Sequence, residues 1–121
     1  MNIPQMALLA CAALALSSVA VADPPWKMAG NIGARHFVVV QAADATDTGL
    51  LKEAAVAACP PELPCVVAFW SDSAAVPTAM PMTRTQQAAM VALYVRNPRS
   101  GTEELQLKCP PDKPSETKCL R

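Results

Sequence analysis

Beyond the N-terminal segment, the apolar runs of this sequence are short and rich in β-branched or aromatic residues. One run covers residues 65–70 (Cys-Val-Val-Ala-Phe-Trp), between a proline and a polar Ser-Asp-Ser segment, and another covers residues 35–41 (Arg-His-Phe-Val-Val-Val-Gln). Nearly continuous apolarity over about six residues is typical of strands that are buried on both faces. We therefore expect the run at 65–70 to form an inner strand of a small sheet.

The residues between these two runs have the spacing of an amphipathic helix. Apolar residues recur on one stripe of the segment 50–59, and alanines on this stripe permit close approach to a sheet. Pro60 and Pro61 end the helix. The order strand, helix, strand predicts a βαβ unit with parallel strands. The stripe consists of Leu51, Ala54, Ala55 and Ala58.

The pattern changes after the second strand. Thr83 and Gln86 have the spacing of a capping box, which predicts a short helix through about Met90. In the segment 91–96, Val91, Leu93 and Val95 alternate with Ala92, Tyr94 and Arg96, as in a half-buried strand. The segment 103–108 also alternates, so the two form a predicted hairpin.

The expected fold is a small two-layer α/β domain, on the border of α+β. It consists of the βαβ unit, the short helix and the C-terminal hairpin, in a mixed sheet of three or four strands. Residues 23–34 contain two prolines and two glycines, which predict an irregular N-terminal arm. Three prolines and mixed charge in residues 110–121 predict a tail with little intrinsic structure.

The first 22 residues have the pattern of an export signal. They contain no charged side chain, have an apolar core at 7–16, and end in Ala-Val-Ala, as before a signal-peptidase site. The apolar core is too short to span a bilayer comfortably. We expect residues 1–22 to be removed, which leaves one domain at 23–121 in the periplasm or outside the cell, without stable membrane insertion. The alternative is lipidation of Cys11 in a lipoprotein-like Leu-Leu-Ala-Cys sequence.

Four cysteines follow this segment, and an even number in an exported chain predicts two disulfides. Of the three possible pairings we favour Cys59 with Cys65 and Cys109 with Cys119, because each pair closes a short proline-rich loop. A zinc site would need the closer spacing of a zinc knuckle.

The charges and the polar residues favour a binding protein over an enzyme. Ten basic and ten acidic residues give no net charge, which argues against nucleic acid or an anionic membrane as partner. We therefore expect a partner protein in the cell envelope or outside the cell. The predicted contact surface is the loop 71–82, which begins with Ser71, Asp72 and Ser73, together with nearby Trp26 and Tyr94. Ligands of open α/β sheets bind at this edge.

A hydrolase is a weaker interpretation of the same residues. A Ser-His-Asp site needs a histidine near Ser71, but His36, the sole histidine, begins its strand and so lies at the opposite end of the sheet. The sequence also lacks the G-x-S-x-G motif of a nucleophile elbow. A non-catalytic interaction protein remains the preferred function.

Soft-metal binding is the second functional hypothesis. Met80 and Met82 place two thioethers close together, and His36 could add an imidazole, a ligand set that suits Cu(I). Methionines also fill gaps in small cores without binding any metal. Copper is therefore the alternative to a function without a cofactor.

Residues 66–70 (Val-Val-Ala-Phe-Trp) followed by Pro77 resemble the strand and active-site turn of thioredoxins, where Phe-Trp precedes Cys-Gly-Pro-Cys. The strand–helix order before this stretch is similar too. In this chain Ala74, Ala75 and Thr78 occupy the region of the redox pair. The resemblance therefore implies a degenerate thioredoxin-like domain without dithiol exchange at that turn.

Overall fold

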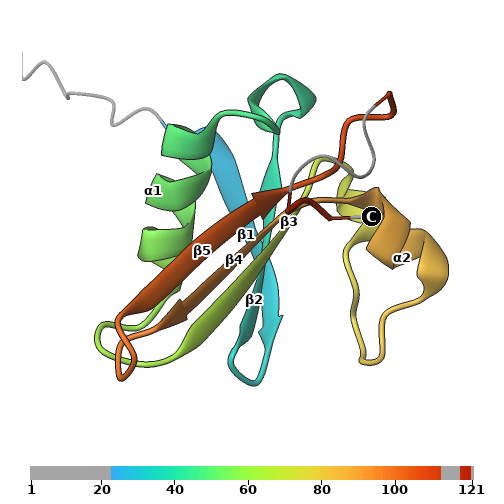
Figure 1. The fold of residues 1–121 in the computed structure, drawn as a ribbon. Coiled ribbons are helices and arrows are strands. Elements are labelled where there is room, and N and C mark those ends of the chain that lie inside the picture. Colours follow the sequence, from blue (N-terminus) through green and yellow to red (C-terminus); the bar gives the residue numbers. More distant parts are fainter. Residues whose placement is uncertain (1–22, 113–117, 121) are drawn as a thin grey trace, which may run out of the picture.

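A computed structural model describes residues 23–112 and 118–120, so the predicted export signal and Cys11 lie outside the described residues. Five strands form one mixed sheet in which spatial order follows chain order (Figure 1). The predicted fold, a small mixed α/β domain with a βαβ unit, a short helix and a C-terminal hairpin, is confirmed. Its elements are β1 (Trp26–Ile32), β2 (Arg35–Val40), α1 (Thr48–Ala58), β3 (Cys65–Trp70), α2 (Arg84–Ala89), β4 (Met90–Asn97), β5 (Thr102–Leu107) and the 3₁₀ helices Ala42–Asp44 and Ser73–Ala75.

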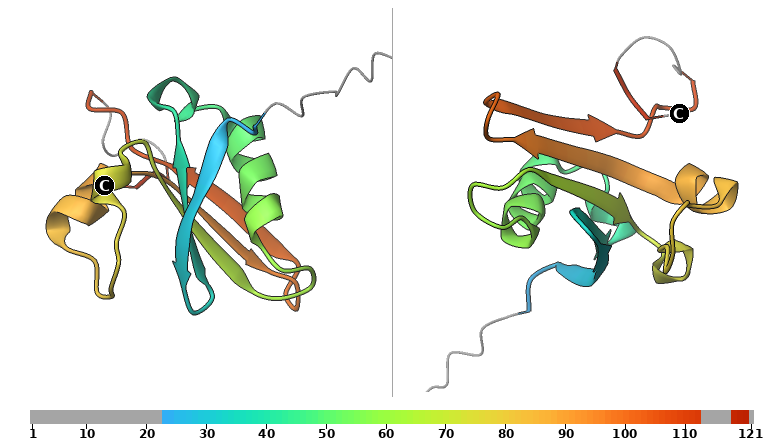
Figure 2. Two further views of the ribbon diagram at one scale, coloured as in Figure 1. Left: turned by 180° about the vertical axis from the view of Figure 1, so that it is seen from behind. Right: turned by 90° about the horizontal axis from the view of Figure 1, so that it is seen from below.

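The sheet has one parallel and three antiparallel pairs of strands. β2 and β3 are parallel and joined by α1, as expected for a βαβ unit. β1 pairs with β2, β4 with β3, and β5 with β4, each in antiparallel orientation. α1 lies against one face of the sheet, while α2 lies on the other side near one end (Figures 1 and 2).

Both helices begin at the polar side chains that their sequences provide. The carboxylate of Asp47 accepts a hydrogen bond from the backbone N–H of Leu50 at 3.1 Å, which caps α1. Thr83 and Gln86 form the predicted capping box of α2. The small residues of the α1 stripe let the helix approach the sheet closely, and its fully buried members are Leu51, Ala54 and Ala55.

The sheet separates two hydrophobic cores, and β3 contributes to both. Val67 and Phe69 point into the core beneath α1, while Ala68 and Trp70 point into a smaller core on the other side. Side chains alternate between the faces of a strand, so an apolar run can serve two cores. Five of the six residues of β3 are buried, which confirms the expected inner strand.

The prediction of an irregular N-terminal arm is wrong for Trp26–Ile32, which forms the edge strand β1. Gly33 makes the turn into β2 with a positive φ of 60°. Gly30 follows the bulge at which the register with β2 shifts. β1 is the fifth strand, beyond the three or four expected. Five of its seven residues are exposed, so main-chain pairing rather than an apolar pattern holds it in the sheet.

Both predicted disulfides are present. The Cys59–Cys65 bond joins the end of α1 to the start of β3. The Cys109–Cys119 bond holds the C-terminal residues beside the end of β5, where the N–H of Leu120 donates to the carbonyl oxygen of Leu107 at 2.9 Å. Disulfides form and persist in oxidising compartments, which agrees with export.

We expect the double variant C59A/C65A to lose about 2–3 kcal/mol of unfolding free energy, because the unfolded chain then regains the entropy of an open loop. Urea titration followed by the fluorescence of buried Trp70 measures this loss. Wild-type protein treated with reductant serves as the control, and mass spectrometry counts its free thiols. An unchanged unfolding midpoint in the variant would contradict the stabilising role of this bond.

Candidate interaction surface

The Ser-Asp-Ser segment lies at the C-terminal end of β3, as predicted, and all three side chains are exposed. Asp72 accepts a hydrogen bond from the backbone N–H of Ala74 at 2.9 Å and so caps the 3₁₀ helix Ser73–Ala75. His36 pairs in register with Val67, four residues before Ser71. The segment therefore forms a turn, and the structure does not assemble a Ser-His-Asp site.

A groove of about 550 Å³ lies beside this segment and is lined in part by Ser71 and Ser73. Its other walls come from the residues that precede and begin β1 and from the end of β2, including Pro24, Lys27 and Gln41. Trp26 does not line it, because its partly buried ring packs against the core beneath α1. The tryptophan thus covers apolar surface.

Tyr94, predicted to contribute to the contact surface, lies in the core instead, with no exposed area. It belongs to the core beneath α1, because the alternation of β4 turns Ala92 and Tyr94 toward the helix. A partner cannot contact a ring in this position. Val95 on the opposite face of β4 is 41 % exposed.

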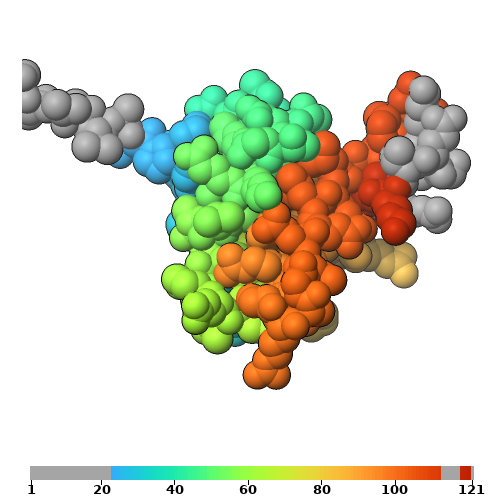
Figure 3. All heavy atoms as spheres, turned by 60° about the vertical axis from the view of Figure 1, so that its left-hand side comes forward, coloured from blue at the N-terminus to red at the C-terminus, as the bar shows by residue number. Residues whose placement is uncertain are grey.

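The Tyr94 hydroxyl ends in a polar network at the edge of this core. It donates to Glu103 Oε2 at 2.8 Å, and Lys52 Nζ lies 2.7 Å from Glu103 Oε1. Burial, followed by the hydrogen bond to Glu103, raises the pKa of Tyr94. The hydrogen bond from Lys52, followed by that from Tyr94, lowers the pKa of Glu103. Figure 3 shows the α1 side of the molecule, where the helix lies beside β5.

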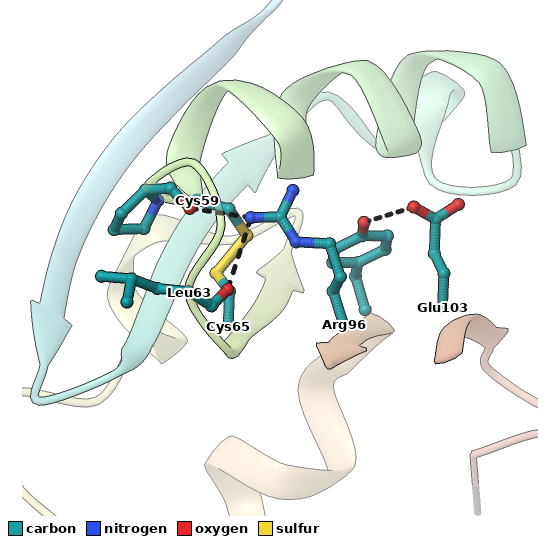
Figure 4. Close-up of a disulfide and its surroundings, with 7 residues drawn as sticks. Cys59, Leu63, Cys65, Arg96 and Glu103 are labelled. Carbon is teal, nitrogen blue, oxygen red and sulfur yellow. Dashed lines mark hydrogen bonds between the residues drawn. A yellow bond between two sulfur atoms is a disulfide. The ribbon is translucent and has the colours of Figure 1, made fainter. Parts of the chain in front are cut away.

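Arg96 extends this network to the loop that the first disulfide closes (Figure 4). Its guanidinium donates to the carbonyl oxygen of Pro60 at 2.8 Å and to that of Leu63 at 3.5 Å. Both acceptors lie between Cys59 and Cys65, so one side chain and one covalent bond hold the same loop. The network connects structural elements and is therefore part of the scaffold of the domain.

The predicted copper ligands do not all come together, because His36 and Met82 lie on opposite faces of the sheet. Met80 is 38 % exposed, whereas Met82 packs against the smaller core. His36 lies on the other side of the sheet, beside Ala57 and Ala58 of α1. Within the residues that the structure describes, no group of three or more His, Cys, Asp or Glu side chains could hold a metal ion.

The residues that the structure describes cover the sheet face opposite α1 at one end only. There the segment before α2, α2 itself and Leu120 cover the smaller core around Phe37 and Trp70. Toward the β1–β2 turn, the same face presents apolar side chains that are only partly buried, or exposed in the case of Val95. We call this region the open face; it consists of Ile32, Val66, Leu93 and Val95, with Arg35 and Glu104 at its two sides.

A groove of about 400 Å³ connects the open face to the covered end. Val66 and Leu93 line it from the sheet, while Met82 and Leu120 line it from the segments that cover the sheet. The loop 71–82, which the sequence predicts as contact surface, thus borders the open face through Met82. The alternation of β4 in the sequence indicates part of this face, because the more exposed set of its alternating residues includes Leu93 and Val95.

In the described part of the chain, no helix is long and apolar enough to cross a membrane. Comparisons with protein-family models, with curated proteins and with solved structures give no match. The structure itself defines the class: a small α+β domain with a five-stranded mixed sheet and two disulfides.

We expect acid to reduce the contribution of Glu103 to stability. A carboxylate with a lowered pKa in the folded state stabilises the protein above its unfolded pKa, and this contribution disappears as the pH falls through the folded pKa. Thermal unfolding should therefore show a larger difference between wild type and Glu103→Gln at pH 7 than at pH 3. Glu53→Gln on the exposed side of α1 is the control, and an equal difference at both pH values would contradict this role.

Proposed function

We propose that this chain is a non-catalytic exported binding protein, periplasmic or secreted, that contacts a partner protein through its open face. One observation carries the proposal: residues 23–112 and 118–120 leave apolar side chains on a sheet face that they cover at one end only. Apolar patches bordered by polar residues mark protein–protein contact sites. Val95 is the exposed apolar side chain of this patch and lies between Val66 on β3 and Glu104 on β5.

The other properties of the chain support this proposal. The two disulfides fit an oxidising compartment outside the cytoplasm. A chain without net charge has no long-range attraction for nucleic acid or an anionic membrane. Apolar contact needs no cofactor, and we propose none.

A photo-crosslinking residue at position 95 tests the proposal. We expect it to give discrete protein adducts in the envelope of the native host, because this side chain lies at the centre of the open face. Position 56 is the matched control: Val56 is 49 % exposed but belongs to α1. Equal adducts from both positions, or none from position 95, would show that the open face is not the contact site.

A charge at the same position provides the functional test. With the crosslinking residue at position 93, we expect Val95→Lys to reduce the adduct yield about tenfold, since it places a charge in an apolar contact. The fold should tolerate it, because Val95 pairs in register with Glu104 on β5 and opposite charges on neighbouring strands are favourable. Val56→Lys should leave the yield unchanged. Crosslinking from a second site on the open face, Leu93, measures the yield in both variants.

A further inference from the structure

We infer that the groove between the open face and the covered end of the sheet binds a small amphipathic carboxylate. Its carboxylate lies at Arg35, and its apolar chain lies toward the segments that cover the sheet. This ligand site goes beyond the proposed function, because Val95, at which the partner protein is expected to bind, does not line the groove. It is carried by one cation at the open side of a mostly apolar groove.

The floor of the groove is apolar and comes from three neighbouring strands. Phe37 on β2, Ala68 on β3 and Leu93 on β4 form one row across it, as the register shows. Met82 and Leu120 line the groove from the segments that cover the sheet. Its volume of about 400 Å³ lies within the roughly 300–1,000 Å³ of small-molecule sites, which are mostly apolar with a few polar groups.

Arg35 lies one row further toward the open side, where it pairs in register with Val66. Two residues along a strand correspond to about 7 Å, so a carboxylate at Arg35 leaves its apolar chain over the floor. Arg35 is exposed and, within the described ranges, has no ion-pair partner. Among the described residues that line the groove, it is the only charged one, and Gln87 adds an amide. A guanidinium binds a carboxylate through two parallel hydrogen bonds.

The acidic side chain of the open face does not neutralise this cation. Glu104 lies on β5, three strands from β2, which corresponds to about 14 Å at the usual strand spacing. This separation exceeds the Debye length of about 8 Å at physiological salt, so the attraction between the two exposed charges is largely screened. Arg35 therefore keeps its positive charge available for a ligand.

The backbone around the groove favours an acyl chain over a peptide. A peptide that binds as an added strand needs the free main-chain groups of a sheet edge. The floor strands β2, β3 and β4 are inner strands, hydrogen-bonded to a neighbour on either side. At the covered end, the N–H of Leu120 donates to the carbonyl oxygen of Leu107, and the carbonyl oxygen of Leu120 accepts from the N–H of Cys109. An acyl chain needs no main-chain partner.

NMR titration of the oxidised protein, recovered after export, tests the site with hexanoate, octanoate and decanoate below their micelle concentrations. We expect the backbone amide signals of Val66, Ala68 and Leu93 to shift, because these residues line the groove. The dissociation constant should fall up to about fourfold for each added methylene that becomes buried. Octanamide has the same length without the charge and should bind about tenfold more weakly than octanoate.

The variant Arg35→Gln keeps a polar side chain but removes the charge. It should weaken octanoate binding about tenfold and leave octanamide binding unchanged, since only the carboxylate loses its partner. Arg99→Gln, in the exposed turn between β4 and β5, is the matched control and should change neither. Arg35 is exposed, so the fold should tolerate its replacement, and the dispersion of the amide signals checks this.

Three results would overturn the ligand site. The first is a titration with octanoate that shifts none of the groove signals. The second is equal binding of octanoate and octanamide to the wild type. The third is tighter binding of the tripeptide Gly-Gly-Leu, with a free carboxylate, than of octanoate, since the groove then takes the end of a peptide. Crosslinking from position 95 tests the proposed function separately, so either result can fail while the other stands.

Discussion

The central strand β3 must bury both of its faces, and the rest of the fold supplies the two covers. Phe69 on one side of the strand and Trp70 on the other both have no exposed area. An apolar strand of this kind is stable only between two layers, because burial of its side chains is the main favourable contribution to folding. On one side α1 covers the larger core. On the other side the cover is assembled from short pieces.

Trp70 explains where this second cover lies. Its ring packs edge-on against Phe37, with ring centroids 5.5 Å apart. Its indole N–H donates to the carbonyl oxygen of Gln86 in α2 at 2.9 Å. A buried indole N–H needs an acceptor, so the bond holds α2 over the end of β3. A helix of six residues cannot reach further along the strand, and the described part of the chain leaves the sheet beyond it open.

The sequence predicts an element correctly where the pattern that defines it lies within one segment of the chain. The run 65–70, the alanine stripe of α1, the Thr83–Gln86 capping box and the two proline-rich cysteine loops each predicted what the structure shows. β1 was missed because its side chains are mostly exposed and only its backbone is engaged. Tyr94 was placed at the surface because both phases of β4 contain apolar residues, and only packing against α1 decides which phase is buried. The alternation of β4 indicates only Leu93 and Val95 of the open face, since its other members come from other strands and require the register.

Glu103 and Glu104 have different bonding partners because they lie on opposite faces of the sheet. They are neighbours on β5, so strand alternation directs them to opposite faces. Glu103 is bonded within the protomer by Lys52 and by the hydroxyl of Tyr94. Glu104 has only a neutral amide beside it in the described chain, and Arg35 at the far side of the same face also lacks an ion-pair partner. The fold thus bonds the charge of Glu103 on the face that α1 covers, and within the described residues it leaves Arg35 and Glu104 on the open face without an ion-pair partner.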